Sequence, residues 1–255
     1  MRSVHEASQH DENCFITLTY DDANLPHGAS LFPRDLELFW KRLRKRLHPR
    51  KIGYLACGEY GTNQDITTTE TIGRPHYHAI IFGYDFPDKV LEAKSPSGEN
   101  RFSSETLTRL WGKGLTDLGT FTFESAAYVA RYQLKKINGE EADDHYTRVD
   151  PRTGEITYIT PEFIRSSKRP AIGRGWFEKY RKDLDKGFIT IRGKKMQFPD
   201  YYKMLLQEHY EEDWMAIADL RKNSVDPLDP DNTLDRLRVK ETLRKKRTNQ
   251  LKREL

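Results

Sequence analysis

The stretch that decides the fold is Arg74-Pro75-His76-Tyr77-His78-Ala79-Ile80-Ile81-Phe82. From Pro75 onward it predicts a β-strand, in which residues i and i+2 point the same way. His76 and His78 therefore set two imidazoles side by side, and two neutral imidazoles at this spacing can share one divalent cation. A solvent-facing or hydrogen-bonded pair is the commoner meaning of His-x-His alone, so a third ligand has to decide.

A carboxylate on the preceding predicted strand is the candidate third ligand. That strand runs from Ile52 to Tyr60 and carries Glu59 near its end, before the Thr-rich loop 61–73. Hairpin pairing with the histidine strand would bring the Glu59 carboxylate to the same face. Two histidines and one carboxylate leave open positions for a hard ion, so the expected cofactor is Mg²⁺ or Mn²⁺. Alone, Glu59 is also consistent with an ordinary strand-end carboxylate.

The order of the predicted elements defines the expected fold class. Around the hairpin, the sequence predicts a strand over 14–20, a basic amphipathic helix over 33–50, a short helix ending near Trp111, a strand over 115–121 and a helix over 124–137. This order matches the split β-α-β-β-α-β arrangement on a central antiparallel sheet, an α/β fold of the α+β type. Such a sheet leaves one face free for a site.

The rest of the chain predicts two small hairpins and a helical extension. The hairpins are expected over 146–158 and around Gly193. A helix over 199–220, a linker over 226–230 and a very basic helix over 234–255 follow. We therefore expect a nuclease domain over 1–198 and a basic helical extension over 199–255.

Composition narrows the classes of protein. The 255 residues include 32% charged and 36% hydrophobic residues, with a net charge of +4 that averages over far more basic local runs. Cys14 and Cys57 lack the spacing of a zinc site or a disulfide scaffold, and no apolar stretch resembles a signal peptide or a membrane span. There is no Gly-rich loop ending in Gly-Lys-Ser/Thr. We expect a soluble cytoplasmic protein without a nucleotide cofactor and without a membrane partner.

The helix predicted over 124–137 carries a second constellation. At about 100° per residue, one apolar stripe groups Ala127, Ala130, Leu134 and Ile137. A face about 150° away groups Tyr128, Tyr132 and Lys135. Aromatic residues four apart on a helix are usually packing residues, but the separate apolar stripe predicts that the core does not need these tyrosines.

Tyrosines near a metal point to phosphoryl transfer. An unperturbed tyrosine has a pKa near 10 and needs a nearby cation or base to become a nucleophile, which Lys135 could supply as charge. A bound metal would polarise the scissile phosphate. Attack would exchange one phosphodiester for another, leaving a 5′-phosphotyrosine and a free 3′-hydroxyl. Because the bond energy stays in the adduct, resealing would need no ATP.

These motifs resemble those of the HUH endonucleases. The metal motif His-hydrophobic-His corresponds to residues 76–78, preceded by a strand such as residues 15–20. Residues 128–132 are similar to the paired-tyrosine motif of replication initiators from microviruses, and residues 132–135 fit a related Tyr-x-x-Lys form. Residues 171–177 are similar to a segment of the gokushovirus-like branch. The resemblance covers about residues 14–180.

The resemblance implies a rolling-circle replication initiator. It implies that one tyrosine opens single-stranded DNA at a replication origin and that the other attacks when the circle is complete, in the cytoplasm of a bacterial host with its helicase and polymerase. Such phage proteins carry a Cys-rich stretch upstream of the first strand, and no such stretch precedes Cys14 here.

Basic residues supply candidate DNA contacts, and two rival functions remain open. The candidates are Arg42, Lys45, Arg46 and Arg74, together with the run Arg244-Lys245-Lys246-Arg247. A solvated helix face is the commoner meaning of such runs. The rivals are a metal-dependent phosphoesterase that uses activated water, with tyrosines that only pack, and a non-catalytic DNA-binding regulator.

Overall fold

The computed structural model describes residues 1–62, 72–95, 98–131, 136–149, 153–224 and 229–249. The chain forms two compact units. One consists of Ser3–Ile172 and holds the main sheet, and the other combines Met1–Arg2 with Gly173–Glu254. The predicted division into residues 1–198 and 199–255 stays a prediction.

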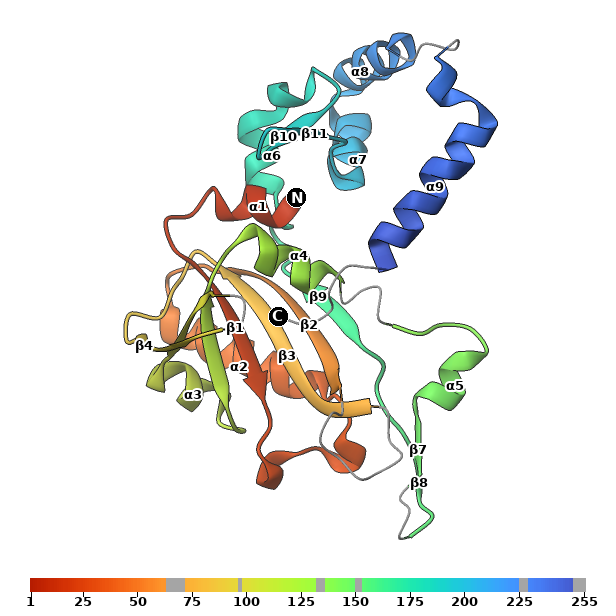
Figure 1. Ribbon diagram of the computed structural model, residues 1–255. Helices are drawn as coiled ribbons and strands as arrows, with labels where there is room; N and C mark the ends of the chain where they lie inside the picture. The colour runs from red at the N-terminus through yellow and green to blue at the C-terminus, as the bar shows by residue number, and fades with distance from the viewer. Residues whose placement is uncertain (63–71, 96–97, 132–135, 150–152, 225–228, 250–255) are drawn as a thin grey trace. The chain divides into compact units, whose positions relative to one another are not determined.

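A seven-stranded sheet is the centre of the first unit (Figure 1). Its strands are β1 (Asn13–Thr19), β2 (Gly53–Thr62), β3 (Ile72–Phe82), β4 (Val90–Lys94), β5 (Asn100–Ser103), β6 (Thr116–Thr120) and β9 (Phe163–Ser166). They lie in the order β4-β5-β6-β1-β3-β2-β9, and every neighbouring pair is antiparallel. The order β6-β1-β3-β2 with intervening helices is the predicted split arrangement, so the α+β fold is confirmed.

Helices cover both faces of this sheet. They are α1 (Arg2–Ala7), α2 (Pro33–Leu47), α3 (Glu105–Trp111), α4 (Phe123–Arg131) and α5 (Glu141–His145), with the short 3₁₀ turns η1 (Asp22–Asn24) and η2 (His27–Ala29). The apolar stripe of α2, including Phe39 and Leu43, and the Trp111 side chain of α3 pack on the face that carries Ile16 and Tyr77. Helix α4 packs on the opposite face (Figure 1). That second face carries the histidines.

Three strands of the main sheet are missing from the sequence prediction. Between Phe82 and Ser103 the sequence predicts a loop, but the structure has the hairpin β4–β5 there. All five β4 residues are exposed, so this edge hairpin lacks the apolar alternation that marks a half-buried strand. β9 is four residues long and pairs with the edge of β2. Short edge strands leave little pattern in a sequence.

The small hairpins are as predicted. β7 (Thr147–Val149) pairs with β8 (Ile156–Tyr158), and β10 (Ile189–Ile191) pairs with β11 (Lys194–Met196). The second unit also contains α6 (Arg174–Tyr180), η4 (Arg181–Leu184), α7 (Asp200–His209), α8 (Glu211–Asn223), η5 (Pro230–Asn232) and α9 (Leu234–Asn249). The prediction of one helix over 199–220 is wrong, because Tyr210 leaves helical geometry with φ −145° and ψ 56° and separates α7 from α8.

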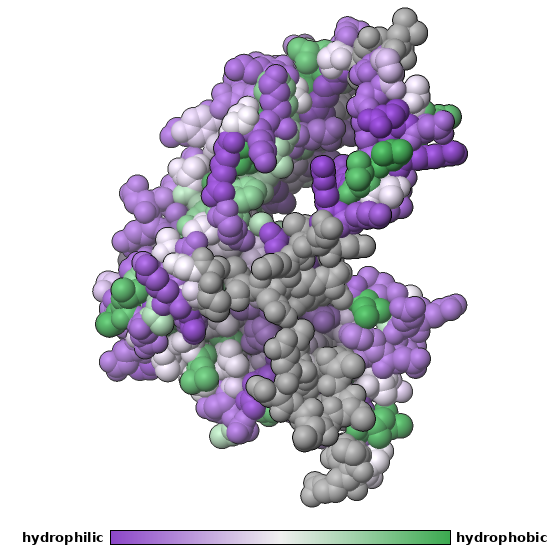
Figure 2. All heavy atoms as spheres, viewed as in Figure 1, coloured by the Kyte–Doolittle hydropathy of each residue, from purple (hydrophilic) through white to green (hydrophobic). Residues whose placement is uncertain are grey.

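The described surface is mostly polar. Figure 2 shows hydrophilic side chains over most of the described atoms on the face it draws, with small hydrophobic spots between them. Within the described ranges, no helix combines the length and the apolar character that crossing a membrane requires.

A buried hydroxyl network joins the histidine strand to the start of α2. The Tyr77 hydroxyl accepts the backbone N–H of Phe32, the N-cap residue of α2, at 2.9 Å. It also lies 2.9 Å from the hydroxyl of Tyr20, which donates to the Asp35 carboxylate at 3.0 Å. Burial raises the pKa of Tyr77 to about 12, so its hydroxyl keeps its proton at neutral pH. The residue between the two histidines therefore positions α2 from the other face of the sheet.

Tyr77→Phe is expected to destabilise the fold without changing the metal face. It leaves the Phe32 N–H and the Tyr20 hydroxyl short of a partner in the interior, which costs about 2 kcal/mol. Thermal unfolding should show a decrease of several degrees, whereas the control Tyr158→Phe, at a side chain that is 75% exposed, should not. An unchanged melting temperature for Tyr77→Phe would show that the network does not stabilise the protein.

Candidate metal centre and active site

Three potential metal ligands converge on the α4 face of the sheet. The β2–β3 register sets Glu59 opposite His76, and His78 follows two residues later on the same face. The ligand atoms of Glu59, His76 and His78 all lie within 4.8 Å of one another. Glu59 is only 2% exposed and His78 only 7%. The structure thus brings together the three residues predicted as ligands, in a sheltered position.

Hydrogen bonds on the outer side of each imidazole orient the triad. His76 Nδ1 lies 3.0 Å from the carbonyl oxygen of Arg74, and because a carbonyl only accepts, His76 Nδ1 carries the proton. His78 Nδ1 lies 3.0 Å from Thr17 Oγ1. Histidine ligands of metals usually donate their second N–H in this way. Both Nε2 atoms therefore face the third ligand.

The inner side of the triad calls for a positive centre. His76 Nε2 and His78 Nε2 lie 2.6 Å and 3.0 Å from the same oxygen, Glu59 Oε1. With its Nδ1 protonated, neutral His76 would direct a lone pair at a carboxylate oxygen. Only a proton or a metal cation between them makes this contact favourable. The residues present therefore fit a divalent cation held by two nitrogens and one carboxylate.

The Glu59 carboxylate keeps its charge despite its burial. Burial by itself raises the pKa of Glu59, but hydrogen bonds from His76 and His78, together with their charges, outweigh it and lower the pKa to about 2. The carboxylate is therefore ionised at neutral pH, as a metal ligand must be. The same triad suits Mg²⁺ or Mn²⁺, although the identity of the ion stays a prediction.

Tyr128 on α4 reaches the triad from above the sheet. Its hydroxyl lies 3.4 Å from His78 Nε2, a long hydrogen-bond distance. The two rings meet edge to face with centroids 5.0 Å apart, and Phe15 of β1 stacks on the other side of His78 at 5.5 Å. A phenolic oxygen and a candidate metal ligand thus share one small space.

The predicted packing of this helix is wrong in phase. The sequence assigns the core stripe to Ala127 and Ala130, but Ala130 is exposed and Ala127 is only half-buried. The buried positions of α4 include Ala126, Tyr128 and Val129. Alanines give a weak hydrophobic signal, and Val129, which is fully buried, sets the orientation of the helix instead. Tyr128 therefore belongs to the buried face, with 7% of its surface exposed, rather than to a separate solvent face.

The other helix candidates fall outside the described residues. α4 ends at Arg131. Tyr132 and Lys135 follow it and lie outside the described part of the chain, so their roles stay predictions. The predicted helix over 124–137 does not extend to Ile137, which is in irregular structure and packs against the α2-side core.

The predicted DNA contacts divide between the two faces of the sheet. Arg42 donates to the carbonyls of Leu110 and Trp111 at 2.7 and 3.1 Å, so its guanidinium holds the end of α3. Lys45 and Arg46 are exposed on α2, which covers the face opposite the triad. Arg74 lies beside His76, donates to the Tyr20 carbonyl at 2.9 Å and forms an ion pair with Asp22.

A cavity beside the triad adds residues that the sequence analysis did not select. Its volume is about 370 Å³, and it runs from His76, His78 and Tyr128 across β1 to β6 and β5. Phe15, Arg101, Asp117 and Gly119 are among the residues that line it. The signals were a glycine inside a predicted strand and the side chains of the first strand that point away from the α2 core.

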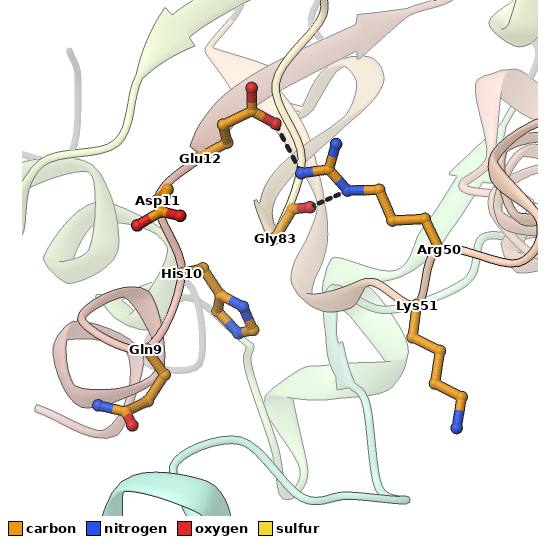
Figure 3. A pocket seen from close by; sticks show the side chains of 7 residues that line it. All are labelled: Gln9, His10, Asp11, Glu12, Arg50, Lys51 and Gly83. Carbon is orange, nitrogen blue, oxygen red and sulfur yellow. Dashed lines mark hydrogen bonds and ion pairs between the residues drawn. The ribbon is translucent and has the colours of Figure 1, made fainter.

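A second hollow lies at the opposite end of the same strands. It is lined by Gln9, His10, Asp11, Glu12, Arg50, Lys51 and Gly83 (Figure 3). Arg50 there donates to the Gly83 carbonyl at 2.7 Å and pairs with Glu12 at 2.6 Å. Because Asn13 pairs with Phe82 and Thr19 pairs with His76, this hollow and the triad lie at opposite ends of β1 and β3.

Comparison with known proteins identifies the class. Residues 13–137, which include β1, the triad and α4, match the family model of the replication-associated protein ORF2. This part of the chain belongs to that family of replication-associated proteins. No solved structure matches the chain significantly.

Individual relatives come from small phages and viruses. The chain is 32% identical over 225 residues to replication-associated protein VP4 of Bdellovibrio phage phiMH2K, covering 84% of this chain and 64% of the relative. It is 30% identical to replication-associated protein ORF2 of Spiroplasma virus 4, covering 83% and 63%, and 30% identical to ORF4 of Chlamydia phage 1, covering 84% and 50%. The chain thus spans between half and two thirds of these relatives' length.

Proposed function

We propose that this protein initiates rolling-circle replication by nicking single-stranded DNA at an origin and joining the cut 5′ end to a tyrosine. The observation that carries the proposal is the approach of the Tyr128 hydroxyl to His78 Nε2, 3.4 Å away, within the Glu59-His76-His78 cluster. A role in phage replication agrees with the names of the relatives. The nicking chemistry itself is inferred from the residues.

The triad would hold Mg²⁺ or Mn²⁺ through His76, His78 and Glu59. When bound, the ion supplies a Lewis acid that polarises a phosphate oxygen and lowers the cost of a nearby phenolate. Thr17 and the Arg74 carbonyl fix the two imidazoles so that their Nε2 atoms point inward. The burial of Glu59 and His78 limits the access of water to these ligands.

Tyr128 would act as a nucleophile toward the scissile phosphorus. Its Oη forms a new bond to phosphorus and loses its proton, while the P–O3′ bond breaks and the 3′ oxygen takes up a proton. One phosphodiester replaces another, so the adduct retains the energy for resealing. The reverse attack by a 3′-hydroxyl restores the DNA and frees the tyrosine.

Tyr132 and Lys135 complete the proposed mechanism. A second tyrosine four residues later lets one phenol open the origin and the other attack after one round of synthesis. Lys135 would stabilise a phenolate by its charge. Single-stranded DNA is the expected substrate, and host helicase and polymerase in the bacterial cytoplasm are the expected partners.

Covalent trapping tests the proposal. The protein is incubated with Mn²⁺ and a single-stranded oligonucleotide library of random sequence labelled at the 3′ end, then boiled in detergent and separated on a denaturing gel. Because the fragment downstream of the nick carries the 5′-phosphotyrosine, the label should migrate with the protein. EDTA should abolish the transfer.

One observation favours the rival phosphoesterase. Tyr128 is only 7% exposed and contacts the apolar cluster of Val129 and Ile80, as a packing residue would. That mechanism predicts metal-dependent cleavage with no label on the protein, because water would be the nucleophile. A non-catalytic regulator would leave the DNA intact under every metal condition. Either result would refute the tyrosine mechanism.

A further inference from the structure

We propose that the cavity beside the triad is a recognition site for one nucleobase of the substrate strand, and that Arg101 and Asp117 bind a guanine there. The inference rests on the proposed function, because it assigns base selection to the same site. It concerns a part of the sheet that neither the metal nor the tyrosine uses.

The sheet register sets the distance between this site and the triad. Thr17 of β1 pairs with His78 of β3 on one side and with Asp117 of β6 on the other. Asp117 thus lies two strand spacings from His78, about 10 Å away on the same face. A short stretch of extended DNA spans this gap, so a base close to the scissile phosphate can enter the cavity.

The floor of the cavity is flat because of Gly119. This glycine pairs with Phe15 of β1 and with Arg101 of β5, in the interior of the sheet. Its backbone is not in the left-handed region, and an added Cβ would meet nothing closer than a Phe15 ring carbon at 3.5 Å. The fold therefore does not require glycine there. A strand glycine without a structural reason marks a place where a ligand approaches the backbone closely.

The wall of the cavity offers donors and acceptors to a base edge. Arg101 Nε donates to Asp117 Oδ2 at 3.0 Å, with the two side chains 51% and 31% exposed. A partly exposed pair of this kind contributes little to stability, so a base can replace part of it at low cost. Guanine accepts from arginine through O6 and N7. Its N1–H and amino group can donate to the carboxylate, and no other base combines both features next to each other in this way.

Selection for binding tests this site without depending on nicking. A random single-stranded DNA library is bound to the protein in EDTA, and the retained strands are sequenced. The wild-type protein should enrich guanine at one position. Asp117→Asn, which turns an amide nitrogen toward the guanine donors, should reduce that preference by roughly ten-fold. Glu12→Gln is the matched control, because Arg50–Glu12 is a similarly exposed pair in the other hollow (Figure 3).

A second variant tests the floor. Gly119→Val should leave the melting temperature equal or higher, since valine favours strands and the space accepts a Cβ. It should lower the affinity for single-stranded DNA by on the order of ten-fold, as expected when one base loses its stacking place. Gly119→Ala should have a smaller effect on affinity.

The outcomes separate this site from the nicking mechanism. An unchanged guanine profile in Asp117→Asn, or a wild-type profile without any base preference, would overturn the base site. So would full affinity in Gly119→Val. A guanine preference that depends on Asp117, found in a protein that never forms a covalent adduct, would support the base site and refute only the proposed nicking.

Discussion

The double variant Tyr128→Phe, Tyr132→Phe is expected to lose covalent adduct formation by at least ~10³-fold, down to background. Each substitution removes a single oxygen and leaves the ring. A phenylalanine ring at position 128 would still fill the space against Val129, so packing survives while no phenolic nucleophile remains near His78. The measurement is transfer of a 3′ label from single-stranded DNA to protein in Mn²⁺.

Two controls make this loss interpretable. Tyr158→Phe alters a tyrosine that is 75% exposed on the β7–β8 hairpin and should leave the adduct yield unchanged. The double variant should also keep its Mn²⁺-dependent rise in melting temperature, because Glu59, His76 and His78 are untouched. Adduct formation at the wild-type level in the double variant would exclude both tyrosines as nucleophiles.

The sequence predicts the metal face well because its signals are local. A strand period of two residues sets His76 and His78 on one face, and one hairpin brings Glu59 opposite His76. Neither step depends on contacts between distant parts of the chain. The central strand order follows in the same way from the order of strands and helices, because few topologies accommodate a split β-α-β unit.

The orientation of α4 could not be predicted by the same reasoning. Ala126, Ala127 and Ala130 differ little in hydrophobicity, so helical periodicity does not determine which of them faces the sheet. The outcome depends on how Val129 fits between β2, β3 and the preceding turn, which is a tertiary contact. The cavity was missed for a related reason, since Arg101 meets Asp117 only after β5 pairs with β6.

Glu59→Gln is expected to lower the affinity for Mn²⁺ by more than ~100-fold, because losing a charged ligand should cost more than the 10- to 100-fold typical of outer-shell changes. The amide keeps the size of the side chain but removes the negative charge that faces His76 and His78 at 2.6 and 3.0 Å. Binding to the native state alone stabilises a protein by about 2.7 kcal/mol at one hundred times the dissociation constant. Wild-type protein should therefore melt several degrees higher in Mn²⁺ than in EDTA.

In Glu59→Gln that Mn²⁺-dependent shift should disappear at the same ion concentration, together with label transfer to the protein. Glu12→Gln, a carboxylate variant at the other end of β1, should keep both signals, which separates loss of the site from loss of general surface charge. A Mn²⁺ shift of wild-type size in Glu59→Gln would mean that the ion binds elsewhere. The short contacts between Glu59 and the histidines would then be held by a proton on an imidazole, and the chemistry would need another source of positive charge.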